Sequence, residues 1–241
     1  MQLSGLILGE TEHWVALNKP AGLLSVPDRL GKEISLKMML REKYGSSFVV
    51  HRLDRDTSGV ILFAKDESTH QLLNKQFEER QTEKIYTGLV EGTPIEEQGS
   101  ITTPIAEHPA GDGRMITHAS GKPSHTDYRV VEVLKPYCLV DYKIHTGRTH
   151  QIRVHMQWLG HSIVCDPLYG DGKPVLVSSL RKKFKLAKNV EEERPILSRL
   201  ALHAARLCFT DHSGQRHTLE APLPKDFSAT LAQLRKAQLK K

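Results

Sequence analysis

The chain has 241 residues, of which 39% are hydrophobic and 26% are charged. A chain of this length and composition can bury a sizeable core, in one large domain or two small ones. Its formal net charge of +6 suits a polyanionic partner but does not identify one. No apolar run approaches the roughly 20 residues that cross a bilayer, so we expect no membrane partner.

The cysteines and the first ten residues favour a cytoplasmic protein. Cys138, Cys165 and Cys208 are odd in number, far apart, and without a C-x-x-C pair. This pattern argues against a disulfide framework and against a zinc site. Residues 1–10 have no basic start and their apolar stretch ends at Glu10, so they are unlike a secretion signal.

The first elements predicted along the chain are two strands at 6–8 and 14–17, joined by a polar turn. The second strand leads into NKPAGLLSVP at 18–27, whose proline and glycine predict a sharp exit from the sheet. Lys19 stands at the end of that strand, and we give it no catalytic role. The spacing of apolar residues in 34–44 predicts a short amphipathic helix.

Residues 51–59 read HRLDRDTSG and separate an apolar strand at 48–50 from a second at 60–64. The second strand has no polar alternation, which predicts that it is covered on both faces. Asp54 therefore lies in a loop at the edge of a sheet, with two arginines next to it. Cations favour the ionised form of a carboxylate, which suits nucleophilic or electrostatic work. The alternative is an ordinary turn with solvated arginines.

A clear amphipathic helix is predicted at 67–80 and a strand with alternating pattern at 84–92. Tyr86 lies on that strand. A tyrosine there commonly belongs to the core, but its ring can also stack on a nucleobase while its hydroxyl serves as a polar group.

Residues 98–122 are rich in Gly, Pro, His and Thr and predict short strands and loops. Strands at 124–133 and 137–145 are predicted to pair around a Lys-Pro turn. Together with the helices, these strands indicate an α+β fold with a mixed, largely antiparallel sheet and flanking helices.

Residues 145–156 read HTGRTHQIRVHM. Thr149 is a credible N-cap for a helix at 150–159. Histidines five residues apart do not share one face of a helix, which argues against a metal site. Arg153 falls one turn after the N-cap and faces the same way as the preceding loop.

Residues 171–199 carry a basic run followed by three glutamates at 191–193. Such a run is either a solvated face or a contact to phosphate. A strand at 200–210 and a helix at 227–239 complete the prediction. The basic residues of the run are Arg181, Lys182, Lys183, Lys185 and Lys188.

Four stretches together resemble the RluA-type pseudouridine synthases. Every fixed position of the family signature HRLDxxTSG is present at 51–59. The other matches are NKPxGLLSVP at 18–27, KxYxAxVxG at 84–92, where Thr87-Gly88 departs from the usual small residues, and HTGRxHQxRxHM at 145–156. The resemblance covers most of residues 6–170 and resumes at 196–224.

The resemblance implies a catalytic site with Asp54 as nucleophile. Tyr86 would stack on the target base, Arg153 would pair with the nucleophile, and Arg52 would fill the space that the extruded base leaves. With RNA as the partner, Arg55 is expected to contact it, and Arg181, Lys182 and Lys183 are candidates for phosphate contacts, with a solvated face as the alternative.

The resemblance also implies a cytoplasmic monomer, with one catalytic domain over 1–241 around a central cleft, and 171–199 as a variable segment within it. The partner would be structured RNA, either rRNA or a tRNA stem-loop. The reaction is an isomerisation, so no metal and no nucleotide or organic cofactor is expected.

Two other functions are weighed against this one. The first is a catalytically silent RNA-binding or ribosome-assembly module of the same fold. The second is a hydrolytic glycosidase, which would need a second carboxylate, and Asp56 is the available one. The sequence leaves open whether Asp54 attacks the ribose C1′ or C6 of uracil.

Overall fold

The computed structural model describes residues 2–28, 30–181, 184 and 192–239. They form two compact units. Unit 1 contains residues 1–86, 143–146 and 203–222, and unit 2 contains 87–142, 147–202 and 223–241. The prediction of one catalytic domain stays a prediction.

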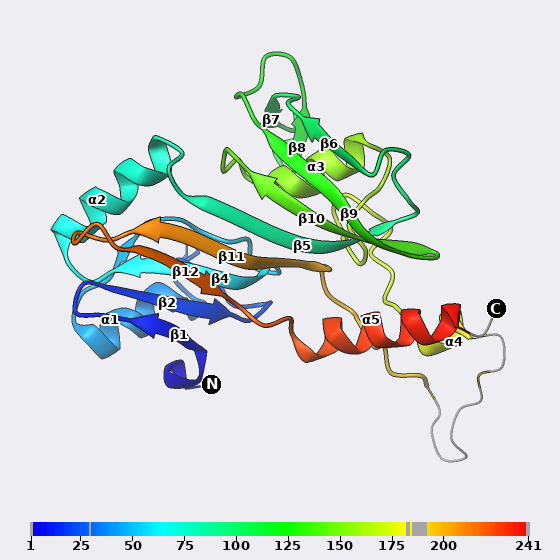
Figure 1. The fold of residues 1–241 in the computed structure, drawn as a ribbon, viewed down its shortest axis with the longest axis horizontal. Coiled ribbons are helices and arrows are strands. Elements are labelled where there is room, and N and C mark those ends of the chain that lie inside the picture. Colours follow the sequence, from blue (N-terminus) through cyan, green and yellow to red (C-terminus); the bar gives the residue numbers. More distant parts are fainter. Residues whose placement is uncertain (1, 29, 182–183, 185–191, 240–241) are drawn as a thin grey trace. The chain divides into compact units, whose positions relative to one another are not determined.

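Unit 1 is built on a sheet with the strand order β1-β2-β4-β11, to which β3 adds beside β4 and β12 beside β11 (Figure 1). Strands β4 and β11 run parallel, whereas β1 with β2, β2 with β4 and β11 with β12 run antiparallel. The strands are β1 (Ile7–Glu10), β2 (Trp14–Lys19), β3 (Phe48–Val49), β4 (Ser58–Ala64), β11 (Leu202–Thr210) and β12 (Arg216–Glu220), with a 3-10 helix at Leu3–Leu6 and helices α1 (Leu36–Tyr44) and α2 (Glu67–Glu78).

The core of unit 1 surrounds β4, all of whose residues are buried, as its unbroken apolar pattern predicts. Trp14 packs edge-on against Phe209 at 5.2 Å between ring centroids. Helix α2 packs against β4 and β3. Its first turn is capped by Asp66, whose carboxylate accepts a hydrogen bond from the backbone N–H of Thr69.

Unit 2 contains the strand order β5-β10-β9-β6 and a separate β7–β8 hairpin. Helix α3 packs against β8 and β9, and α5 packs against β9 and α4. The elements are β5 (Glu83–Glu91), whose first four residues belong to unit 1, β6 (Gln98–Ile101), β7 (Ile105–Glu107), β8 (Met115–Thr117), β9 (Thr126–Leu134), β10 (Tyr137–Ile144), whose last two residues belong to unit 1, α3 (Gln151–Trp158), α4 (Val177–Leu180) and α5 (Lys225–Gln238).

The predicted α+β class with a largely antiparallel sheet is confirmed, and all three cysteines are free and buried. The prediction of Thr149 as an N-cap is wrong. Helix α3 starts at Gln151, and its N-cap is His150 in the left-handed conformation, with φ 55°. No described helix is both long and apolar enough to cross a membrane.

Gly59 is required by the parallel pairing of β4 with β11. It lies opposite Ala204, and a Cβ atom built on it would be 2.1 Å from the carbonyl oxygen of Ala204. Its φ of +116° is a conformation that side-chain-bearing residues rarely adopt. The clash is with backbone, so the two strands would have to separate to relieve it.

We expect Gly59→Ala to lower the free energy of unfolding by more than about 4 kcal/mol, because it adds overpacking to backbone strain. The control is Gly214→Ala, since Gly214 has φ +81° but open space around it. It should cost only about 1 kcal/mol. Urea unfolding measures both, and equal losses would show that φ alone matters at Gly59.

The ring of His51 joins strand β4 to helix α2. Its Nε2 accepts a hydrogen bond from the backbone N–H of Leu62 at 3.0 Å, and the ring stacks on Phe77 at 4.8 Å between centroids. Burial, and to a lesser extent the positive charge of Lys84, lower the pKa of His51 to about 3. The imidazole is therefore neutral at physiological pH and acts as a hydrogen-bond acceptor.

This pKa predicts acid sensitivity of unit 1. The unfolded chain takes up the His51 proton near pH 6.5 and the folded chain only near pH 3. Stability from this group is therefore present above pH 6.5 and is lost as the pH falls toward 3. In His51→Asn the amide keeps an acceptor but does not titrate. The free energy of unfolding of the variant should consequently fall less between pH 6.5 and about pH 4, by a difference on the order of 2 kcal/mol, as measured by urea unfolding at the two pH values. Parallel pH profiles would contradict the assignment.

Candidate functional site

The signature loop, residues 51–57, connects β3 to β4 in unit 1. Leu53 and Thr57 are buried, while Arg52 and Arg55 are exposed. Asp54 lies between them and is half-buried. The loop is therefore anchored in unit 1 by the buried side chains of Leu53 and Thr57, whereas Asp54 is partly accessible.

Lys19 binds this loop through a buried side chain. Its side chain is fully buried, and its ammonium group donates to the carbonyl oxygens of Pro20, Leu23 and Arg55 at 3.1, 2.7 and 2.7 Å. These three bonds match the three donors of an ammonium group. They join the segment after β2 to the residue that follows Asp54.

Two further contacts tie the segment after β2 to the signature loop. The hydroxyl of Ser25 donates to the carbonyl of Leu53 at 2.8 Å and accepts from its N–H at 3.1 Å. The N–H of Gly22 donates to the carbonyl of Arg55 at 2.9 Å. The backbone is thus fixed on both sides of Asp54.

The end of the signature is fixed by β11. The hydroxyl of Ser58 lies 2.9 Å from Nδ1 of His203. The other ring nitrogen of His203, Nε2, lies 3.1 Å from the carbonyl oxygen of Ala221. Since a carbonyl only accepts, Nε2 carries the proton and Ser58 donates to Nδ1. Both side chains are buried.

Tyr86 lies in unit 1, within range of the negative charge of Asp54. Burial raises the pKa of Tyr86 well above its usual value, and the negative charge of Asp54 raises it further. The phenol is 9% exposed and remains protonated. It can therefore offer an aromatic face and a hydroxyl donor beside the carboxylate.

Lys84 shares a face of β5 with Tyr86, because residues two apart on a strand point the same way. It is 8% exposed, and its ammonium group lies 5.4 Å from the centroid of the Phe77 ring. Burial, assisted by the charge of Arg80, lowers the pKa of Lys84 to about 8. Sequence reasoning did not identify this buried cation, although the family motif begins with it.

Arg153 is buried in unit 2 and forms a two-pronged ion pair with Asp166. Its Nε and Nη2 donate to the two carboxylate oxygens at 2.7 and 2.8 Å. Asp166 is fully buried and also accepts from the N–H groups of Leu168 and Tyr169. Arg153 is therefore held in one orientation by a partner that the sequence did not reveal. Its predicted pairing with Asp54 stays a prediction.

Three residues of the HTGRTHQ segment support the loop before α3. The side chain of Gln151 accepts from the N–H of Arg148 and donates to the carbonyl of His125. The guanidinium of Arg148 donates through Nε to the carbonyl of Pro123, at 3.0 Å. Nδ1 of His150 lies 2.8 Å from the hydroxyl of Tyr169.

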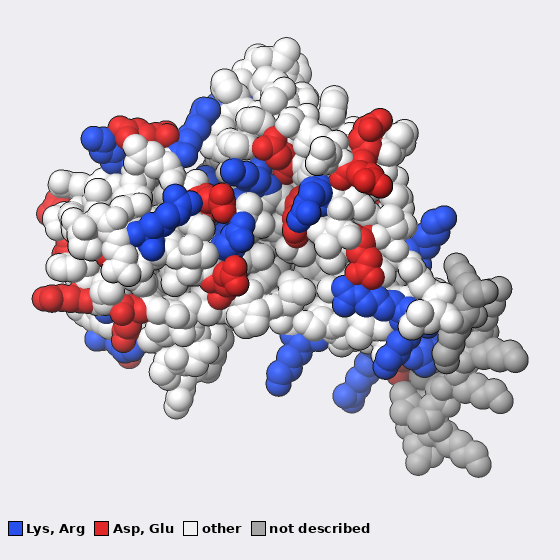
Figure 2. Space-filling view, viewed as in Figure 1, with Lys and Arg blue, Asp and Glu red and all other residues white. Residues whose placement is uncertain are grey.

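Two of the predicted RNA contacts, Arg55 and Arg181, have partners within the protein. Arg55 forms an exposed ion pair with Glu33 at 2.8 Å, and Arg181 donates to the side chain of Gln233. Figure 2 shows basic and acidic side chains intermixed over the face that it draws. Lys182 and Lys183, and with them Lys185 and Lys188, lie outside the described residues, so a phosphate-binding role of the basic run stays a prediction.

Known proteins are similar to this chain in sequence and in fold. A model of the family RNA pseudouridylate synthase matches residues 13–158. A dual-specificity RNA pseudouridine synthase RluA of Salmonella typhi is 35% identical over 233 residues, which cover 92% of this chain and 94% of that protein. The ribosomal large subunit pseudouridine synthase D of Nitrosomonas europaea is 35% identical over 236 residues. This match covers 95% of the chain but only 65% of the Nitrosomonas protein.

The solved structure of human RNA Pseudouridylate Synthase Domain Containing 4 aligns with a TM-score of 0.73 and 25% identity, over 97% of this chain and 94% of the human one. The expected resemblance is confirmed by these matches. The chain belongs to the RNA pseudouridine synthase family, of the RluA type.

Proposed function

We propose that this chain isomerises selected uridines in structured RNA to pseudouridine, with Asp54 as the nucleophile. The observation that carries the proposal is the fixed backbone on both sides of Asp54, made by Lys19 and Ser25. A carboxylate held this way can meet a bound uridine without further ordering, which lowers the entropic part of the barrier.

The reaction balances without a cofactor. The target uridine leaves its stack, which costs a few kcal/mol and costs least in loops. Asp54 attacks the ribose C1′ or C6 of uracil, and the bond between N1 and C1′ breaks. The uracil turns over and C5 bonds to C1′, the bond between Asp54 and the substrate breaks and returns the free carboxylate, and the proton of C5 is lost while N1 gains one. No electron or group is transferred to another molecule.

Tyr86 supports this chemistry through its position near Asp54 and its retained proton. Its ring can stack on the extruded uracil, as aromatic rings do in sites that receive flipped bases. Arg153 is proposed to keep Asp54 charged and oriented through a charge-assisted hydrogen bond. The ion pair with Asp166 supports that role, since it fixes the guanidinium before substrate arrives.

The RNA is proposed to be rRNA or a tRNA stem-loop, and the chain to act as a monomer in the cytoplasm. The name of the Nitrosomonas relative, a ribosomal large subunit pseudouridine synthase, supports rRNA, and the name of the Salmonella relative, a dual-specificity RNA pseudouridine synthase, supports more than one RNA substrate. Arg52 is exposed at the signature loop, which favours the role of filling the space left by the extruded base. Arg55 is exposed beside it and can reach the RNA backbone.

A silent binding module is disfavoured, because it would have no need of a carboxylate at Asp54 whose flanking backbone is fixed on both sides. A glycosidase would need a second carboxylate at the site, and Asp56 is exposed in the same loop. The two enzymes differ in product. A hydrolase releases free uracil, whereas an isomerase leaves it attached to the RNA.

We expect Asp54→Asn to abolish pseudouridine formation and to leave RNA affinity within a few-fold of the wild type. The measurement is tritium release from RNA labelled at C5 of uridine, together with filter binding. The matched control is Asp56→Asn, two residues away, which should keep most activity. Retained tritium release in Asp54→Asn would refute the nucleophile, and free uracil as the product would identify a hydrolase.

We expect Lys19→Met to lower the free energy of unfolding by about 3–5 kcal/mol, because three carbonyl oxygens lose their buried donor. In the protein that remains folded, kcat should fall about 100-fold, since a misplacement of the Asp54 loop by about 1 Å has effects of this size. KM should change little. Lys32→Met, at an exposed lysine of the same unit, is the control. A loss of stability with unchanged kcat would confine Lys19 to folding.

A further inference from the structure

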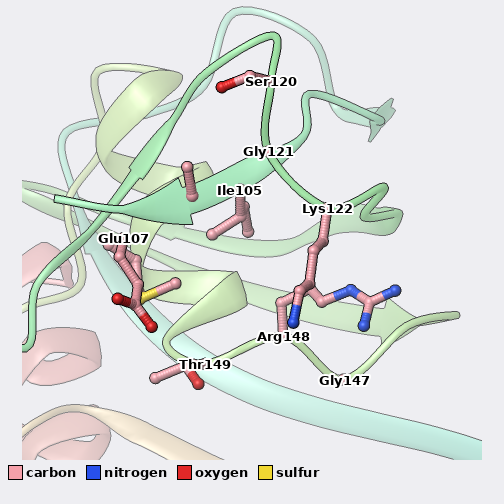
Figure 3. A pocket seen from close by; sticks show the side chains of 10 residues that line it. Ile105, Glu107, Ser120, Gly121, Lys122, Gly147, Arg148 and Thr149 are labelled. Atoms are coloured by element: carbon pink, nitrogen blue, oxygen red, sulfur yellow. The ribbon is translucent and has the colours of Figure 1, made fainter.

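Unit 2 contains a pocket that the proposed chemistry does not use. It has a volume of about 410 Å³, within the range of roughly 300–1,000 Å³ that is typical of ligand sites. Strand β7, strand β8, residues 120–122 and residues 147–149 before α3 supply its walls (Figure 3).

The frame of the pocket is rigid. Ile105 and Lys122 exchange two backbone hydrogen bonds, of 2.8 and 3.0 Å. Gly121 allows this close approach, because a Cβ on it would be 2.5 Å from the carbonyl carbon of Ile105. Met115 packs with Ile105 against Tyr169, and its N–H donates to the hydroxyl of Tyr169 at 2.8 Å.

One side of the pocket is cationic. Figure 3 shows Lys122 and Arg148 on the same side of Ile105, and Glu107 on the other side. The Nε of Arg148 is used by the carbonyl of Pro123, whereas its two terminal amino groups and the ammonium of Lys122 have no partner within the described residues. Five other arginines of unit 2 form ion pairs with carboxylates instead: Arg114, Arg129, Arg153, Arg199 and Arg235.

The opposite side differs in chemistry. Ile105 and Met115 line the pocket with apolar side chains, and Figure 3 shows Ile105 between the cations and Glu107. A small inorganic anion would use only the cationic side. A ligand that uses the whole pocket carries an anionic group at one end, a flat apolar body, and N–H donors at the other end, because a carboxylate only accepts hydrogen bonds.

We propose that this pocket binds one unstacked nucleotide of the substrate RNA, other than the target uridine, and that it prefers guanosine. Its phosphate contacts Arg148 and Lys122, its base lies on Ile105 and Met115, and Glu107 accepts from the base edge. Guanine offers two adjacent donors, N1–H and the N2 amino group, which a carboxylate can accept together. Uracil offers one donor between two acceptor oxygens.

The inference rests on the proposed function, so the experiment begins by measuring tritium release by the wild type. Absence of that activity would overturn the proposed function and not the pocket. Binding to the pocket is followed by NMR, through the methyl signal of Met115, one of five methionines. The protein is labelled with 13C at its methionine methyl groups. The signal is assigned by Met115→Leu. The probes are GMP, UMP and inorganic phosphate.

We expect GMP to shift the Met115 signal at concentrations at least five-fold lower than UMP, and inorganic phosphate to leave it unmoved. Lys122→Ala should weaken GMP at least three-fold and Arg148→Ala at least ten-fold. The matched controls Lys135→Ala and Arg129→Ala remove exposed cations of the same unit that do not line the pocket. Glu107→Gln should remove the preference for GMP over UMP. An unmoved Met115 signal, or an equal response to phosphate, would overturn the proposal.

The RNA arm separates a nucleotide within the substrate from a free nucleotide. An RNA that the wild type modifies should move the Met115 signal and compete with GMP. Lys122→Ala and Arg148→Ala should raise KM for that RNA at least three-fold, with kcat within three-fold of the wild type. A Met115 signal that responds to GMP but not to the RNA would identify a site for free nucleotides and overturn the assignment to substrate.

Discussion

The buried ammonium group of Lys19 is the interaction on which the signature loop depends. The ammonium group donates its hydrogen bonds to three carbonyl oxygens instead of to water, and one of these oxygens belongs to Arg55, next to Asp54. A buried cation is costly unless its donors are satisfied, and here each donor has a carbonyl partner. Because those carbonyls come from two chain segments, the arrangement forms only when both segments are in place. The fold of the first motif and the position of the proposed nucleophile are therefore coupled.

In unit 2 the buried charge that fixes a neighbouring residue is an anion, Asp166, rather than a cation. Asp166 is fully buried and accepts from Arg153 and from two backbone N–H groups. This carboxylate leaves the guanidinium little freedom to turn. In both units, a buried charge fixes the residue that it bonds. Its well-aligned hydrogen bonds offset the free energy that is lost when the charge leaves water. Sequence alone shows neither partner, because Lys19 is paired with main-chain oxygens and Asp166 lies thirteen residues after Arg153.

The elements with strong periodicity were predictable. The apolar run of β4, the amphipathic pattern of α2 and the turn between β9 and β10 gave these elements within a few residues of their observed bounds. Strand β12 was not predicted, because none of its residues is buried and it depends on pairing with β11 rather than on an apolar pattern. The N-cap of α3 was misplaced for a related reason. His150 adopts a left-handed conformation, and its bond to the distant Tyr169 favours that state more than local propensity does.

The nine-residue signature separates into residues that build the fold and residues that face outward. His51 bonds β4 and stacks on α2, Leu53 is tied to Ser25, Ser58 bonds His203, and Gly59 admits the backbone of β11. Arg52, Arg55 and Asp56 are exposed. Asp54 stands between the two groups, half-buried and next to Tyr86. A residue in that position is fixed by the fold but needed by none of its strands, and this is the position in which a protein can place a reactive carboxylate without weakening its own core.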